Sequence, residues 1–106
     1  MKLVVAVLQD RDWPTLRDQL VEHNFRFTRL SSSGGFLRQG NTTLMLGVQD
    51  EQVDEVISLI RRVGKPREEY VVVPSAISDP EVSFPVKVTI GGGTIFVIDV
   101  DSMERI

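Results

Sequence analysis

Residues 2–24 read KLVVAVLQDRDWPTLRDQLVEHN, and this stretch predicts a β-strand followed at once by an α-helix. Residues 2–9 form an apolar, largely β-branched run that ends at polar residues, which is typical of a central strand covered on at least one face. Asp12 can cap the helix that follows. The apolar residues of that helix recur at helical spacing before Asn24 ends it: Trp13, Leu16, Leu20 and Val21.

The next segments predict a hairpin and a second helix. Apolar and polar residues alternate over 25–30, which is the period of a strand, and a loop over 31–41 leads to a further strand over 42–48. Acidic residues then open a helix that ends at Gly64. The apolar stripe of this helix is Val53, Val56, Ile57, Ile60 and Val63.

The last part of the chain is less regular. Residues 70–73 and 84–90 are strand-like, and a polar connection joins them. The triplet Gly91–Gly93 precedes a strand over 94–100 and lacks the G-x-G-x-x-G spacing, so it is no dinucleotide fingerprint. We expect a hairpin turn at the triplet.

The order strand, helix, strand, strand, helix, strand is the split βαβ of the ferredoxin-like fold. We therefore predict an α+β protein with a long insertion before the last strand, and a single domain over residues 1–106. A four-stranded sheet with both helices on one side leaves its other face open. Self-association is the natural way to cover that face.

The composition narrows the classes of function. The chain has 106 residues, no cysteine and a formal net charge of −3. The absence of cysteine excludes thiolate catalysis and cysteine metal sites, and the net negative charge argues against binding of long nucleic acid. Apolar runs fall far short of the roughly 18 residues that span a bilayer, so we expect a cytoplasmic protein without membrane insertion.

Catalytic residue sets are not evident in the sequence. His23 is the only histidine and has no companion ligand, so neither a metal site nor a catalytic base is expected there. Ser31–Ser33 lacks the context of a nucleophile, and no pair of carboxylates suggests acid–base chemistry. We expect a protein that is not an enzyme and that has neither catalytic nor metal-binding residues nor a cofactor.

The segment SSSGGFLRQGNTTLMLG, residues 31–47, carries the most functional information. Phe36 and Leu37 stand beside glycines in a loop, where they can form a stacking platform for a base such as adenine. The same two residues can instead pack against another subunit, and both roles are compatible at a subunit boundary. Asn41 is either a turn residue or a partner for a base edge, and Arg26 is either a solvated strand residue or a phosphate ligand.

Four stretches together resemble the PII-like cyclic-di-AMP receptor family of bacteria. They are KLVVAVLQD (2–10), NFRFTRLSSSGGFLRQGNTTLMLGV (24–48), VDEV (53–56) and GGGTIFVIDV (91–100). The resemblance implies a homotrimer of ferredoxin-like subunits that binds cyclic-di-AMP in the clefts between neighbouring subunits. It also implies that the signal passes to a downstream protein partner, which the sequence does not identify, through ligand-driven ordering of loops.

The resemblance also implies roles for individual residues. Arg26 and Thr28 would contact the ligand from the second strand, Asn41 would bind the base, and Gly47 would let the ligand approach the backbone. The remaining implied ligand-binding residues are Gly35, Phe36 and Leu37 in the loop and Phe96 in the last strand. Phe27 stands where the family often has a smaller residue, which leaves open whether it relines the cleft. Two alternatives to a cyclic-di-AMP receptor stay open. The chain can be a sensor of ATP or ADP, or a structural trimer that has lost ligand binding.

Overall fold

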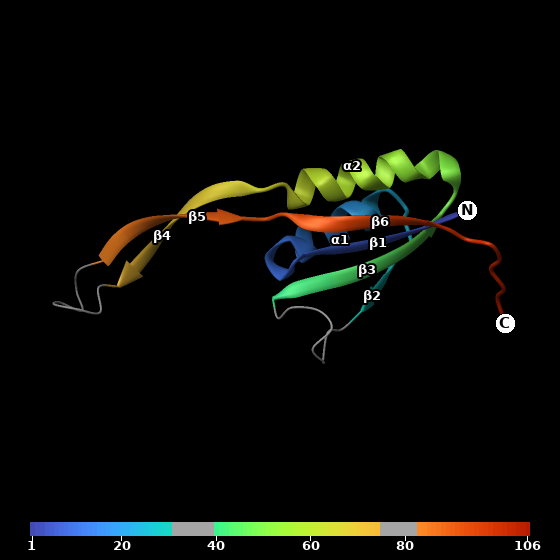
Figure 1. The fold of residues 1–106 in the computed structure, drawn as a ribbon, viewed down its shortest axis with the longest axis horizontal. Coiled ribbons are helices and arrows are strands. Elements are labelled where there is room, and N and C mark those ends of the chain that lie inside the picture. Colours follow the sequence, from blue (N-terminus) through green and yellow to red (C-terminus); the bar gives the residue numbers. More distant parts are fainter. Residues whose placement is uncertain (31–39, 75–82) are drawn as a thin grey trace.

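The computed structural model describes residues 1–30, 40–74 and 83–106 of the chain. Within these residues the chain forms two α-helices and six β-strands (Figure 1), which confirms the α+β class. Two short 3₁₀ turns precede the helices. In chain order the elements are β1 (Lys2–Gln9), the turn Asp10–Asp12, α1 (Trp13–Glu22), β2 (Thr28–Leu30), β3 (Asn41–Val48), the turn Asp50–Gln52, α2 (Val53–Gly64), β4 (Arg67–Pro74), β5 (Ser83–Ile90) and β6 (Gly93–Asp99).

Four of the strands form one antiparallel sheet in the order β2-β3-β1-β6. The two central strands are the long apolar ones, as expected when a strand is covered by helices. This order, with α1 after β1 and α2 after β3, is consistent with the split βαβ arrangement predicted from the sequence.

The hydrophobic core lies between this sheet and the two helices. Alternate residues of β1 and β3 point into it, because successive side chains of a strand face opposite ways. The fully buried members are Val4, Ala6, Leu16, Leu20, Leu44 and Val56, each 0% exposed. Both helices therefore cover the same face of the sheet.

The opposite face of the sheet, called here the open face, has no cover among the residues that the structure describes. Leu3, Val5 and Val7 alternate with the core residues of β1 and are only partly buried. Phe96 and Ile98 of β6 share this face by register and are 53% and 48% exposed. An apolar surface of this kind is typical of a contact surface.

The remaining two strands, β4 and β5, pair over their whole length as a hairpin, called here the arm. Figure 1 shows the arm reaching away from the four-stranded sheet, so that the molecule measures 62 × 28 × 20 Å. The sequence predicted two strand-like segments here. Pairing from Arg67 to Ile90 confirms them and makes both strands longer than predicted.

Several local predictions are wrong. Val21, predicted on the apolar face of the first helix, is 62% exposed. Residues 25–27 are not part of β2. Phe25 is buried and its N–H bonds to the Leu20 carbonyl oxygen at 2.9 Å, after Asn24 turns the chain with a φ of 62°. The Phe27 ring packs edge-on against the Trp13 ring, with 5.3 Å between the two ring centroids. Phe25 and Phe27 are thus apolar because they pack under α1, and Phe27 lies with the core rather than on the open face.

The glycine triplet is not a hairpin turn. β5 pairs with β4 and β6 pairs with β1, so Gly91 and Gly92 connect the arm to the sheet. Both have a φ of 86°, a conformation that glycine adopts without strain.

The predicted helix cap is also wrong, because Asp12 makes no side-chain cap on α1. Its carboxylate bonds to Arg67 at the base of the arm.

Candidate functional site

Of the five predicted ligand residues that the structure describes, four lie on the open face. Thr28 is opposite Met45, Met45 is opposite Val5, and Val5 is opposite Phe96, so these four form one row across the sheet. Residues directly opposite in antiparallel strands share a face.

Asn41 and Gly47 belong to the same face as Met45, since they are an even number of residues away from it. Arg26 is exposed and precedes β2. Gly35, Phe36 and Leu37 lie outside the described residues.

A single chain does not gather the described members of this set into one pocket. Thr28 and Phe96 lie on the two edge strands, three strand spacings or about 14 Å apart. Asn41 and Gly47 are six residues apart along β3, which corresponds to about 20 Å. The predicted residues therefore mark opposite edges and ends of one face.

Asn41 lines a cavity at the end of the sheet nearest the arm. The cavity has a volume of about 310 Å³. Gln9 pairs with Asn41 in the strand register, and its Oε1 accepts a hydrogen bond from the Gly91 N–H at 2.8 Å. The whole lining is Val7, Leu8, Gln9, Asn41, Gly91, Gly92, Gly93 and Thr94.

Sequence reasoning did not single out Gln9. The only signal was a polar residue at the end of an apolar strand, and the connection to Gly91 spans most of the chain.

Asp10 fixes the start of β3 next to Asn41. Its N–H bonds to the Gly40 carbonyl oxygen at 2.8 Å, and its carboxylate accepts the Thr42 hydroxyl at 2.5 Å. Arg29 donates to the same Thr42 hydroxyl oxygen at 3.3 Å and lies 5.3 Å from the centre of the Trp13 ring. Arg29 is thus held on the helix side of the sheet, away from the open face.

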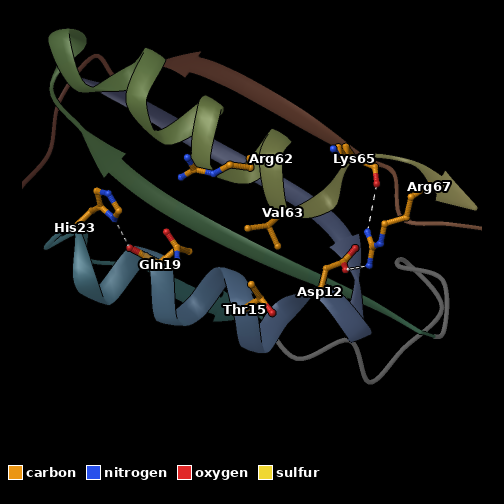
Figure 2. A pocket seen from close by; sticks show the side chains of 8 residues that line it. All are labelled: Asp12, Thr15, Gln19, His23, Arg62, Val63, Lys65 and Arg67. Carbon is orange, nitrogen blue, oxygen red and sulfur yellow. Dashed lines mark hydrogen bonds and ion pairs between the residues drawn. The ribbon is translucent and has the colours of Figure 1, made fainter.

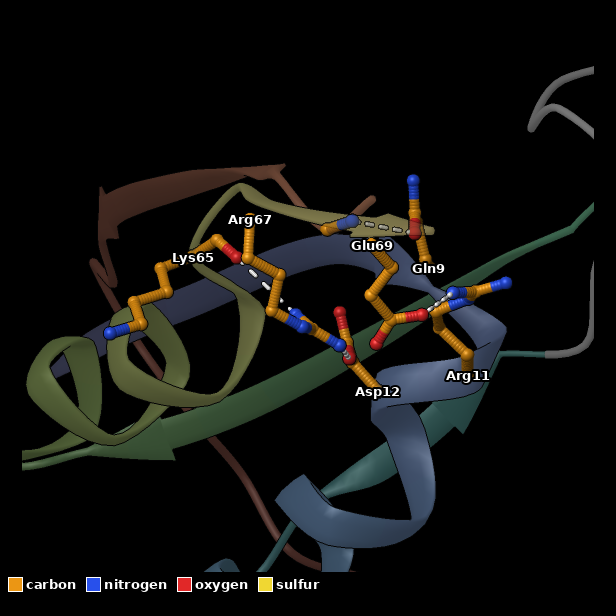
Figure 3. A network of polar contacts seen from close by, with 7 residues as sticks. Gln9, Arg11, Asp12, Lys65, Arg67 and Glu69 are labelled. Carbon is orange, nitrogen blue, oxygen red and sulfur yellow. Dashed lines mark hydrogen bonds and ion pairs between the residues drawn. The ribbon is translucent and has the colours of Figure 1, made fainter. Parts of the chain in front are cut away.

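The turn Asp10–Asp12 also holds the base of the arm, as Figure 3 shows. Arg67 Nη2 donates to Asp12 Oδ1 at 2.7 Å, and this hydrogen bond raises the pKa of Arg67. Arg11 and Glu69 form a looser ion pair at 3.6 Å. Asp12 is only 3% exposed, and its other oxygen, Oδ2, has no hydrogen-bond partner among the described residues.

A second hollow, the groove between α1 and α2, is shown in Figure 2. It has a volume of about 630 Å³ and meets the arm at Arg67. Asp12, Thr15, Gln19 and His23 line one side, and Arg62, Val63, Lys65 and Arg67 line the other. None of the predicted ligand residues that the structure describes lies here, so this groove is separate from the open face.

The described residues contain no group of three or more His, Asp or Glu side chains placed to hold a metal ion. No helix among them is long and apolar enough to cross a membrane.

Comparison with known proteins gives the family. The family described as "Cyclic-di-AMP receptor" matches residues 1–106, the full sequence given. The chain belongs to the cyclic-di-AMP receptor family. Proteins of this family are non-enzymatic receptors, which confirms that the chain is not an enzyme.

A solved structure supports the same fold. It is the crystal structure of a functionally unknown protein from Pediococcus pentosaceus, with 43% sequence identity and a TM-score of 0.80. The match covers 99% of this chain and 96% of that one. Along nearly its whole length, the chain therefore has the same PII-like α+β fold as the Pediococcus pentosaceus protein.

Proposed function

We propose that the chain is a receptor that binds cyclic-di-AMP in clefts between the subunits of a ferredoxin-like homotrimer. The observation that carries this proposal is the strand register. Thr28, Asn41, Gly47 and Phe96 all belong to the one face of the sheet that the helices leave uncovered.

The spread of these residues favours a site between subunits. Thr28 and Phe96 lie on opposite edge strands, about 14 Å apart. A contact between the β2 edge of one subunit and the β6 edge of the next would bring such residues together. The exposed apolar side chains of the open face, such as Phe96 and Ile98, supply a surface that subunit association would bury.

The residue types match the chemistry of a dinucleotide. Phe96 offers a flat face for stacking of a base, a contact of about 1 to 3 kcal/mol. The Asn41 amide can both donate to and accept from a base edge. Arg26 offers a charge to a phosphate. A Cβ at Gly47 would have no atom within 4 Å, so the open space beside it can admit the ligand.

The loop residues Gly35, Phe36 and Leu37 complete the proposed site. They lie four to six residues before Asn41 in the sequence, so a loop that folds over the open face would bring Phe36 near the same base. The ligand is the only small molecule that the proposal requires, and no cofactor is included.

Isothermal titration calorimetry with cyclic-di-AMP tests the proposal, with ATP and cyclic-di-GMP as controls at the same salt concentration. We expect selective binding near one ligand per subunit, and light scattering on a sizing column should give a trimer. Preference for ATP would favour the alternative of an ATP or ADP sensor. A trimer that binds none of the three would favour a structural role and contradict the proposal.

A further inference from the structure

The groove between α1 and α2 is rich in positive charge, although the chain as a whole has a formal net charge of −3. Its lining includes the cations Arg62, Lys65 and Arg67, and Asp12 is the one carboxylate among the lining residues. Arg67 is paired with Asp12, whereas neither Arg62 nor Lys65 has an ion-pair partner among the described residues. A local excess of cations of this kind favours binding of an anion.

Asp12 supplies a second, independent observation. Its side chain is 4% exposed, and Oδ1 accepts the hydrogen bond from Arg67 at 2.7 Å. Its other oxygen, Oδ2, is buried without a hydrogen-bond partner in the described part of the chain. Buried polar atoms in folded proteins are nearly always hydrogen-bonded. The unpartnered Oδ2 therefore points to a ligand group that donates a hydrogen bond.

A ligand can reach this oxygen from the groove. Figure 2 shows Asp12 at the end of the groove nearest Lys65 and Arg67. The Arg67 side chain, which lies against the Asp12 carboxylate, is 34% exposed. A long side chain that is partly exposed changes rotamer rapidly, so Arg67 can make room without disturbance of the core.

A phosphate group that keeps an O–H satisfies both observations. Its ionised oxygens pair with guanidinium and ammonium groups, and its O–H donates to a carboxylate oxygen. Sulfate has the same tetrahedral shape but no O–H at neutral pH, so a carboxylate oxygen repels it. The phosphate groups of cyclic-di-AMP are diesters and also lack an O–H.

The groove has room for more than the phosphate. Its volume of about 630 Å³ lies in the range of small-molecule sites. Thr15, Gln19 and His23 follow at intervals of four residues and line the groove as one polar stripe, about 12 Å long. The organic part of a phosphomonoester can lie along this stripe. The open face, which subunit association is proposed to bury, lies on the other side of the sheet.

We propose that the groove between α1 and α2 is a second binding site, which takes a phosphate group with an O–H, either as inorganic phosphate or as a phosphomonoester. Arg62 and Lys65 neutralise the ionised oxygens, and Asp12 Oδ2 accepts the O–H. The inference goes beyond the proposed function and does not depend on it, because the groove shares no residue with the predicted cyclic-di-AMP site.

The test follows the backbone amide signals of the full nitrogen-15-labelled chain by nuclear magnetic resonance. The probes are sodium phosphate, glycerol phosphate and sodium sulfate, at one ionic strength and about pH 7. We expect saturable shifts at Thr15, Gln19 and Val63 but not at Phe96 on the open face. The tighter of the two phosphate compounds should bind about fivefold to tenfold better than sulfate, the effect of one hydrogen bond to a charged group. The order of these two compounds separates free phosphate from an ester as the ligand.

Two pairs of variants test the two roles. Asp12→Asn places an N–H donor within reach of the position of Oδ2, so the preference for phosphate over sulfate should be lost. Asp18→Asn, in the exposed Arg17–Asp18 pair, should keep that preference. Arg62→Gln should weaken binding of phosphate and sulfate at least about fivefold, and it serves if Asp12→Asn does not fold. Arg61→Gln, which changes a neighbouring arginine outside the groove, should match the parent.

The outcomes decide the proposal separately from the receptor function. Sulfate binding as tight as phosphate binding in the parent overturns the phosphate site, and so does a lack of saturable shifts in the groove with all three probes. An Asp12→Asn protein that keeps the parent's preference for phosphate also overturns it. A groove that selects phosphate in a chain that calorimetry shows not to bind cyclic-di-AMP supports this site while the proposed function fails.

Discussion

The substitution Gly47→Ala separates fold from function in one position. Gly47 lies within β3 opposite Leu3, and a Cβ added there would have no atom within 4 Å. Glycine inside a strand is less favourable than alanine by about 0.5 to 1 kcal/mol, because the unfolded chain gives up more freedom. We therefore expect Gly47→Ala to raise the free energy of unfolding by about 0.5 kcal/mol.

The same methyl group should weaken ligand binding. It would fill the open space through which the proposed ligand approaches the backbone of β3. Overpacking of this kind costs about 1 to 3 kcal/mol, or roughly 5-fold to 150-fold in affinity. Urea denaturation and calorimetry with cyclic-di-AMP measure the two effects on the same preparation.

Gly93→Ala is the matched control on the other side of β1. A Cβ at Gly93 would collide with the Val7 carbonyl oxygen and lie 3.3 Å from the Leu8 Cα. Both are backbone atoms that cannot move aside, so we expect a loss of about 1 to 3 kcal/mol in stability. A stability loss for Gly47→Ala equal to that for Gly93→Ala would refute the packing argument, and unchanged affinity would remove Gly47 from the site.

Three further predictions concern the core, the pH dependence and the loop. Leu44→Ala, at a side chain that is 0% exposed, should lower the free energy of unfolding by about 2 to 5 kcal/mol in urea titrations; a loss under about 1 kcal/mol would contradict the core assignment. The hydrogen bond from Lys2 lowers the pKa of Asp99 from 3.8, so the pair stabilises the fold above that value and loses its effect as the pH falls through the lowered pKa. Asp99→Asn should therefore lower the urea midpoint slightly at about pH 7 and leave it equal to the parent's at about pH 2, and an equal loss at both would contradict the ion pair. Phe36→Ala should weaken cyclic-di-AMP binding by about 1 to 3 kcal/mol with the trimer intact, and unchanged affinity in calorimetry would exclude base stacking by Phe36.

Much of the fold could be predicted because hydrophobic periodicity reports burial directly. β1 follows the sequence pattern because its alternate residues face the core, and so do Val56 and Ile60 of α2, although Leu59 is buried there where Ile57 was expected. The prediction failed at Phe25 and Phe27, where an alternating pattern arose from packing under α1. Local pattern alone does not distinguish these two origins.

The candidate site could be predicted only in part. The alternation of β3 puts Asn41 and Gly47 on one face from sequence alone. That Thr28 and Phe96 share this face depends on the register with β1 and β3, which no local pattern specifies. The bond between Asp12 and Arg67 joins residues 55 positions apart, and Asp12 looked instead like an ordinary helix cap.

The two faces of the sheet have different surroundings, and the turn Asp10–Asp12 contacts both the start of β3 and the arm. One face packs against the helices to form the core, while the open face carries four of the predicted ligand residues, Thr28, Asn41, Gly47 and Phe96. Asp10 reaches the start of β3 at Thr42, and Asp12 reaches the arm at Arg67. Both residues lie in the turn before α1, whose first residue, Trp13, is buried. The turn therefore joins the core, the start of β3 and the base of the arm through side-chain contacts.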